Sequence, residues 1–290
     1  MKFGFSLYNV LTYPSELARV ARAAEEAGFE SLFTPDHLVF PMEMPATYPY
    51  ARDGRPPPAT SGAHPRYDPW ALLSHLAAAT SRIRLGTNVY ILPLRDPIAT
   101  ARATATLDVL SNGRALIGVG VGWLKEEFEI IGRDFGTRGA VTDEAIQLLK
   151  QLWTQKVVEY RGKHLAYGPF MFEPKPVQKP HPPVLVGGTT PPALRRAARY
   201  GDGWMSTGDD YETTKGKLAE LRRLLKEQGR ERAPFEVTCS LSQADRDAVR
   251  RYEDLGATRL LVPPVSIRDK VTPDQFIDGL KRVADSVIDR

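Results

Sequence analysis

Short apolar segments alternate with amphipathic segments along the whole chain, and this alternation constrains the fold more than any other feature. Eight apolar runs typical of buried strands each precede a helical pattern; they lie at residues 3–8, 30–34, 83–90, 115–117, 184–186, 203–206, 235–241 and 259–262. Eight strand–helix units within 290 residues predict an α/β fold, a closed (β/α)8 TIM barrel. Two doubly wound domains would instead need a linker, for which only the proline-rich segment 174–183 qualifies. We expect a single domain over residues 1–290.

Two segments interrupt the alternation. Residues 38–67, after the second strand, are rich in proline, glycine and tyrosine and have no period of either kind. Loops of that length are usually functional, so we expect a lid over the site. Residues 157–167 have the pattern of a hairpin with a turn at Gly162, which predicts an insertion between the fourth and fifth strand–helix units.

Composition and charge exclude several classes of protein. The 39 basic and 35 acidic residues are mixed along the chain, so no basic block indicates nucleic acid binding. The single cysteine, Cys239, excludes an internal disulfide framework, and the absence of CxxC and HExxH motifs gives no indication of a metal site. The first ten residues lack a signal region and no apolar run approaches the length of a membrane span. We therefore expect a cytoplasmic protein that contacts neither nucleic acid nor membrane.

A glycine-rich stretch, RALIGVGVGWLKEE at residues 114–127, follows the fourth apolar run. A dinucleotide-binding fingerprint needs a third glycine where the helix opens, and Trp123 stands there instead, which argues against conventional NAD binding. The glycines either bring the backbone close to a ligand or merely let a barrel strand pack and turn. Trp123 could line a flat cofactor at the barrel mouth.

In a TIM barrel the active site lies at the C-terminal ends of the strands. Four separated stretches would meet there: Asp36 with His37, Asn88, Gly120 to Trp123, and Gly187 to Thr190. His37 follows a strand and the rigid Pro35, and an imidazole titrates near neutral pH, so it could accept or donate a proton. The alternative is that Asp36 and His37 only cap a loop and pack.

The sequence Gly187-Gly188-Thr189-Thr190 follows the fifth strand and precedes a helix. Two glycines and two hydroxyls before a helix expose backbone N–H groups, which is a common arrangement for holding a phosphate. A plain turn with Thr190 as helix N-cap has the same pattern. A phosphate site after a late strand is frequent in this fold, which favours the first interpretation.

Six segments, taken in order over nearly the whole chain, resemble the luciferase-like flavin and deazaflavin oxidoreductases, especially their coenzyme F420-dependent branch. They are TPDHL, TSRIRLGTNVYILPLRDP, ATLDVLSNGRALIGVGVGWLKEEFE, TRGAVTDEAI, PKPVQKPHPPVLVGGTT and ALRRAARYGDGWM. The resemblance implies a TIM barrel with an insertion, a tricyclic cofactor across the barrel mouth, and two-electron transfer from its central ring. It also implies a homodimer.

The resemblance assigns roles to individual residues. Asp36 matches a cofactor-side carboxylate and His37 the histidine that handles the proton, so these two are the predicted catalytic residues. The peptide between Asn88 and Val89 matches a non-proline cis bond in a strand bulge against the cofactor ring. The full set of predicted cofactor-binding residues is Asp36, His37, Asn88, Val89, Gly120, Val121, Trp123, Gly187, Gly188, Thr189 and Thr190.

One position departs from the family pattern. Members that oxidise sugar phosphates carry a glutamate directly after the glycine-rich strand, where this chain has Trp123. The departure argues against the same substrate and leaves the general acid open, with Glu126 and Glu127 as nearby candidates.

Three functions follow from these observations. The first is an F420-dependent oxidoreductase that transfers a hydride between the deazaflavin and an unidentified small organic substrate. The second is an FMN-dependent monooxygenase of the same fold, which would need a flavin reductase as partner. The third is a non-catalytic protein that binds a flavin or phosphate ligand. In each case the lid residues Tyr48, Tyr50, Arg52 and Arg55 could select the ligand.

Overall fold

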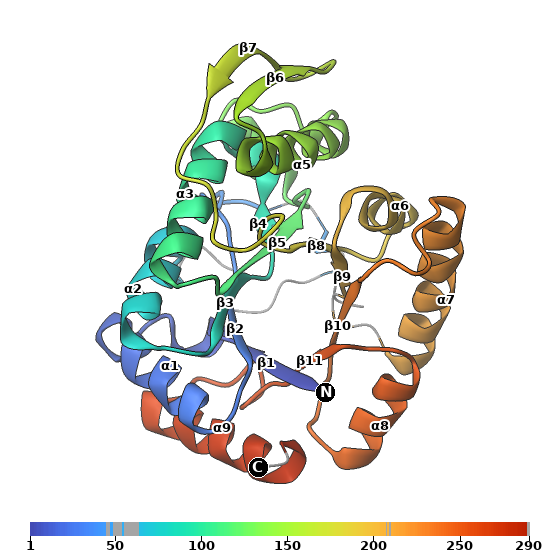
Figure 1. Cartoon of the computed structure of the whole chain (residues 1–290). Helices are drawn as coiled ribbons and strands as arrows, with labels where there is room; N and C mark the ends of the chain where they lie inside the picture. The colour runs from blue at the N-terminus through green and yellow to red at the C-terminus, as the bar shows by residue number, and fades with distance from the viewer. Residues whose placement is uncertain (45–46, 49–53, 55–63, 207, 209, 289–290) are drawn as a thin grey trace.

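Eight parallel strands close into a barrel in the computed structural model, which describes residues 1–44, 47–48, 54, 64–206, 208 and 210–288. The barrel strands are β1 (Lys2–Ser6), β2 (Ser31–Thr34), β3 (Arg84–Thr87), β5 (Ala115–Gly120), β8 (Val184–Gly187), β9 (Gly203–Met205), β10 (Glu236–Ser240) and β11 (Arg259–Leu261). Pairing of β1 with β11 and of β3 with β5 completes the ring. The predicted (β/α)8 barrel is confirmed (Figure 1).

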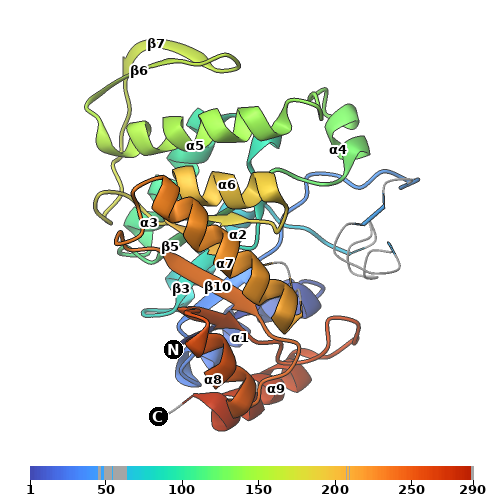
Figure 2. The same ribbon diagram turned by 90° about the vertical axis from the view of Figure 1, so that its right-hand side faces the viewer.

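Helices surround the barrel (Figures 1 and 2). They are α1 (Leu17–Glu26), α2 (Pro69–Ala79), α3 (Pro97–Leu110), the short α4 (Lys125–Ile130), α5 (Arg138–Thr154), α6 (Pro191–Tyr200), α7 (Tyr211–Glu227), α8 (Arg246–Asp254) and α9 (Pro273–Val287). Their starts follow from local chemistry, because proline fits the first turn and a short polar side chain caps it. Asp68 and Asp96 cap α2 and α3 by accepting the N–H of Ala71 and Ala99.

Two hydrophobic layers hold the barrel. Strand residues alternate between its inside and its outside, and β2 and β5 are buried throughout, as parallel strands covered on both faces should be. Outward residues pack under the helices in the main core. Inward residues from five strands form a second cluster: Phe33, Leu116, Leu185, Met205 and Leu261, with Val89 packed against it. Because the helices and the interior cluster bury both faces of the strands, the site lies at the strand ends.

The third predicted strand, 83–90, is interrupted. After β3 ends at Thr87, the peptide between Asn88 and Val89 is cis, and the chain resumes pairing with β5 as β4 (Tyr90–Ile91). The resemblance implied this bulge, and the structure confirms it. A smaller difference lies in β1, which ends at Ser6 rather than at Tyr8 because Tyr8 begins a 3-10 turn.

The predicted hairpin is present between α5 and β8. Its strands, β6 (Val157–Arg161) and β7 (Ala166–Met171), pair antiparallel in a separate sheet, outside the helical layer (Figures 1 and 2). Both carboxylate oxygens of Glu144 on α5 accept hydrogen bonds from the turn, at the N–H groups of Lys163, His164 and Leu165. Glu144 therefore fastens the turn of the hairpin to α5, while Val158 and Tyr160 of β6 pack in the main core.

The described part of the chain has no helix that combines the length and the apolar composition needed to cross a lipid bilayer.

Candidate active site at the C-terminal ends of the barrel strands

The predicted site residues gather at one end of the barrel. His37 follows β2, Val89 lies between β3 and β4, and Trp123 follows β5. Gly187 ends β8, and Gly188 to Thr190 follow it. Two groups of them are in direct contact. His37 and Trp123 lie with ring centroids 6.1 Å apart, edge to face, and Val89 packs against Gly120 and Gly187.

The imidazole of His37 is held on three sides. Its Nδ1 lies 2.8 Å from Oε2 of Glu127, and its ring centroid lies 4.6 Å from that of Phe40. Trp123 presents an edge contact from the loop after β5. The histidine side chain is 9% exposed. This packing fixes the orientation of the ring, as a proton-transferring group requires.

Glu127 is the carboxylate partner of His37. It lies on α4, one helical turn beyond Trp123, and its side chain is fully buried. Its other oxygen, Oε1, accepts the N–H groups of Leu38 (2.6 Å) and Val39 (3.3 Å). Sequence reasoning named Glu126 and Glu127 only as nearby candidates for the general acid. It did not indicate that a residue in the first turn of the helix after β5 would contact the loop after β2.

Asp36 has different neighbours from those expected. Arg95 forms a bidentate ion pair with it, at 2.5 and 2.6 Å, and the N–H of Ile91 donates to Oδ2 at 2.9 Å. Burial raises the pKa of the Asp36 carboxyl, while Arg95 and the Ile91 N–H act in the opposite direction. Both oxygens thus bond protein groups, and these contacts tie the loop after β2 to the bulge segment. The catalytic role expected for Asp36 stays a prediction.

Gly120 and Gly187 make room for Val89. A Cβ atom on Gly120 would lie 2.5 Å from Cγ2 of Val89, and one on Gly187 would lie 2.6 Å from its Cγ1. Distances that short are incompatible with an unmoved valine. We expected Gly120 to let a cofactor ring lie against the backbone of β5 and Gly187 to belong to a phosphate loop; in the structure both also make room for the Val89 side chain, and their cofactor roles stay predictions. Val121, the next residue after β5, is half-buried.

The loop after β8 has fewer free donors than the sequence indicates. Gly188 has φ +111°, its N–H donates to the Met205 carbonyl, and its own carbonyl accepts Nε1 of Trp204 at 2.7 Å. Thr190 is the N-cap of α6, but the two residues that follow are prolines, which have no N–H. Lys217 of α7, which sequence reasoning did not single out, places its ammonium 3.2 Å from the Thr189 carbonyl. It supplies a positive charge beside the loop.

Two residues of the predicted lid contact the aromatic neighbours of His37. Tyr48 packs its ring edge-on against Trp123, with centroids 5.1 Å apart. Arg66 lies over the rings of Tyr8 and Phe40, and burial lowers its pKa. The other proposed selectivity residues, Tyr50, Arg52 and Arg55, lie outside the described residues.

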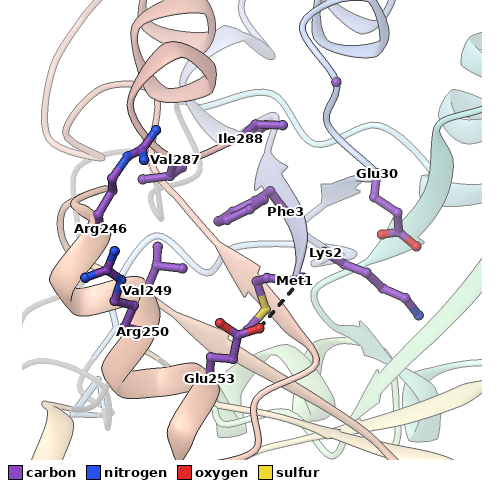
Figure 3. Close-up of a pocket in the computed structure, with 11 residues that line it drawn as sticks. Met1, Lys2, Phe3, Glu30, Arg246, Val249, Arg250, Glu253, Val287 and Ile288 are labelled. Carbon is purple, nitrogen blue, oxygen red and sulfur yellow. Dashed lines mark ion pairs between the residues drawn. The ribbon is translucent and has the colours of Figure 1, made fainter. Parts of the chain in front are cut away.

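A cavity of about 590 Å³ opens at the opposite end of the barrel (Figure 3). It lies between the start of β1 and the helices α8 and α9, and the N-terminal amine and Glu253 form an ion pair of 4.0 Å at its edge. It contains none of the predicted site residues. The site is therefore assigned to the end that carries His37 and Glu127.

Comparison with known proteins agrees with this geometry. The family model described as luciferase-like monooxygenase matches residues 1–263. The chain belongs to the luciferase-like monooxygenase family. Membership of this family, with F420-dependent dehydrogenases among its relatives, places it among oxidoreductases.

Two relatives illustrate the range of this luciferase-like family. An uncharacterized protein of Mycobacterium tuberculosis is 34% identical over 289 residues, covering 98% of each chain. An F420-dependent glucose-6-phosphate dehydrogenase of Nakamurella multipartita is 30% identical over 260 residues, covering 88% of this chain and 71% of its own.

Solved structures show the same luciferase-like fold. A monooxygenase from Streptomyces bottropensis superimposes with a TM-score of 0.80 at 21% identity, covering 99% of both chains. A coenzyme F420-dependent tetrahydromethanopterin reductase from Methanopyrus kandleri gives a TM-score of 0.75 at 19% identity, covering 99% of this chain and 98% of its own.

Proposed function

We propose that this protein is an F420-dependent oxidoreductase that transfers a hydride between the deazaflavin and a small organic substrate. The observation that carries the proposal is the His37–Glu127 pair, buried at the catalytic end of a luciferase-like barrel and bonded at 2.8 Å. The F420-dependent relative that is 30% identical over 88% of this chain supports the choice of cofactor.

The residues at the barrel mouth fit a flat, phosphate-bearing cofactor. Val89, seated by two glycines, offers an apolar surface for a ring, and Trp123 offers an aromatic wall beside His37. Thr189 and Thr190, with Lys217 beside the Thr189 carbonyl, offer hydroxyls and a positive charge for a phosphate. Because α6 begins with two prolines, Lys217 has a larger part in that site than the helix N-terminus.

When bound, the deazaflavin supplies the atom that gives or takes the hydride. His37 exchanges the accompanying proton through its Nε2, since Nδ1 is engaged by Glu127. Phe40 and Trp123 shield the imidazole from water. Asp36 and Arg95 hold the loop after β2 against β4, which fixes the position of His37 relative to Val89.

A direct titration tests the cofactor. We expect purified protein to bind F420 with a dissociation constant in the micromolar range or tighter, followed by fluorescence of the deazaflavin, and to bind reduced FMN more weakly. Tight binding of reduced FMN together with no binding of F420 would contradict the proposal.

A second candidate function is an FMN-dependent monooxygenase, which the family model's own description favours. It predicts oxygen uptake when reduced FMN is supplied by a separate flavin reductase. Oxygen uptake coupled to substrate oxidation would establish it, whereas turnover with F420 under nitrogen would exclude it as the main activity.

Glucose 6-phosphate is not the substrate that we propose. Trp123 occupies the position after β5 and its ring packs against His37 and Tyr48, so the space beside the histidine is bounded by aromatic rings. Such a boundary suits a substrate with an apolar body better than a sugar phosphate. We also propose a homodimer, for which light scattering should give twice the chain mass of 32.2 kDa; a monomeric mass would contradict it.

A further inference from the structure

We propose that Glu127 is a positioning residue that fixes the tautomer of His37, so that Nδ1 carries the hydrogen and Nε2 is the nitrogen that exchanges a proton with substrate. The same carboxylate fixes the start of the loop after β2. Glu127 makes both sets of hydrogen bonds. Its Oε2 bonds the imidazole of His37, and its Oε1 accepts the main-chain N–H groups of Leu38 and Val39.

The hydrogen-bond inventory determines the direction of each bond. Backbone N–H groups can only donate, so Oε1 of Glu127 is an acceptor toward Leu38 and Val39. A carboxylate has no hydrogen of its own, so Oε2 is also an acceptor, and Nδ1 of His37 must donate to it. A neutral imidazole has one N–H, which leaves the lone pair on Nε2.

The residues around the imidazole of His37 oppose any other hydrogen-bonding arrangement of the ring. Glu127 is fully buried and the His37 side chain is 9% exposed, so water cannot easily replace either partner. Phe40 and Trp123 contact the ring and oppose its rotation. The neighbouring carboxylate of Asp36 is held by Arg95 and Ile91 and does not compete for Nδ1.

The catalytic consequence rests on the proposed function. For a substrate oxidised at a hydroxyl-bearing carbon, the C–H bond breaks as its hydride passes to the deazaflavin and the C–O bond becomes a carbonyl. The hydroxyl O–H bond breaks at the same time, and its proton forms a bond with Nε2 of His37. In the reverse direction Nε2 returns that proton to the carbonyl oxygen. Only the tautomer with a free Nε2 can begin the oxidation.

Glu127→Gln tests the role because it keeps the size of the side chain and changes its donors. The amide oxygen of glutamine must face the two N–H groups of Leu38 and Val39, because two donors would repel its NH2 group. That NH2 group then faces Nδ1, which must become an acceptor, so the hydrogen moves to Nε2. Glu129→Gln is the matched control, because it removes the same charge from the same helix at an exposed position bound to Lys125.

The measurement is nitrogen-15 NMR of the imidazoles in the unliganded protein. The chain has five histidines, so His37→Ala suffices to assign the signal of His37. We expect neutral His37 to carry its hydrogen on Nδ1 in the parent and in Glu129→Gln, and on Nε2 in Glu127→Gln. A parent protein with the hydrogen on Nε2 would overturn the inference without recourse to any variant, as would an unchanged tautomer in a folded Glu127→Gln protein.

Kinetics separate this inference from the proposed function. If both hold, Glu127→Gln lowers kcat with F420 by about 10²- to 10⁴-fold and leaves KM and cofactor affinity near the parent values. Equal losses in kcat and in cofactor affinity would indicate that Glu127 only shapes the pocket, and would contradict the positioning role. Absence of turnover in the parent with F420 would contradict the proposed function and leave the NMR result to decide the tautomer.

Discussion

Val89 shows how single residues shape this site. Its side chain lies between Gly120 of β5 and Gly187 of β8, and each glycine leaves space that one methyl group of Val89 fills. Glycine is required at these positions by the close approach of a side chain, whereas at Gly188 it is favoured by a positive φ. The two requirements look the same in a sequence.

Gly187→Ala should destabilise the protein because the new methyl group would overlap Val89. We expect a loss of about 1–3 kcal/mol in the free energy of unfolding, measured by urea denaturation. Adding Val89→Ala should restore part of it by emptying that space. Gly216→Ala on α7 is the control, since nothing lies within 4 Å of its added Cβ and helix propensity should improve. Equal stability of Gly187→Ala and the parent would contradict this account.

His37→Ala should abolish turnover while cofactor binding persists. Loss of a general acid–base group costs about 10²- to 10⁴-fold in kcat, and the cofactor contacts that we propose for Val89 and the loop after β8 would remain. Stopped-flow turnover and fluorescence titration measure the two effects separately. His75→Ala, at an exposed position of α2, should behave as the parent. A parallel loss of binding and turnover would show that His37 serves mainly to hold the cofactor.

Individual elements are joined by carboxylates that accept several backbone N–H groups. Glu25 of α1 binds the N–H groups of Ser81, Arg82 and Ile83 just before β3, and Glu144 of α5 binds the turn of the hairpin. Glu127 of α4 binds the start of the loop after β2 in the same way. Each bond satisfies main-chain donors that no helix or sheet would otherwise pair.

Glu144→Ala should loosen the turn of the hairpin and leave the barrel intact. The amides of Lys163, His164 and Leu165 would lose their acceptor, so their hydrogen exchange should accelerate while that of β5 and β8 stays the same. Glu159→Ala is the control because Glu159 lies in the same hairpin and pairs only at the surface with Arg161. Unchanged exchange at the turn would refute the anchoring role.

The anchor should also depend on pH. Burial raises the pKa of Glu144, but the N–H groups of His164, Leu165 and Lys163 outweigh burial and hold the pKa below its ordinary value of 4.5. Stabilisation from a carboxyl with a lowered folded pKa is complete above the unfolded value and disappears as the pH falls through the folded one. The difference in melting temperature between the parent and Glu144→Ala should therefore be largest near neutral pH and shrink below pH 4.5.

At the scale of the whole molecule, the two ends of the barrel carry different residues. One end has His37, Glu127 and the bulge, whereas the other has Arg259, which is fully buried and paired with Glu30 and Glu236. Lys2 and Arg84 add charge to that cluster. Its members come from strands that meet where the barrel closes.

Arg259→Met should destabilise the barrel strongly, because it leaves two carboxylates beside each other without their shared cation. Breaking a buried ion pair by removing one partner costs about 3–5 kcal/mol. Denaturation in guanidinium chloride measures the loss. Arg223→Met on the surface of α7 should change stability little, since exposed ion pairs contribute little. A stability of Arg259→Met equal to that of the parent would contradict a structural role for the cluster.

The sequence predicts the fold of this molecule more completely than its site. Strand and helix periods are local, so the eight units, the hairpin and the helix caps at Asp68 and Asp96 could be predicted from neighbouring residues. The contact between His37 and Glu127 joins residues 90 positions apart and depends on where α4 is placed. For the same reason, no local pattern shows that Arg95 engages Asp36 or that Val89 fills the space above two glycines.

The buried arginine cluster has a practical meaning for engineering. Because Arg259, Glu30 and Glu236 lie at the end of the strands away from His37, a mutant library restricted to this cluster explores heat tolerance without altering the chemistry. Such a library has to include Lys2 and Arg84, because replacing Glu236 by an apolar residue would leave these two cations without their carboxylate partner. Selection for new substrates can proceed independently in the loop after β2.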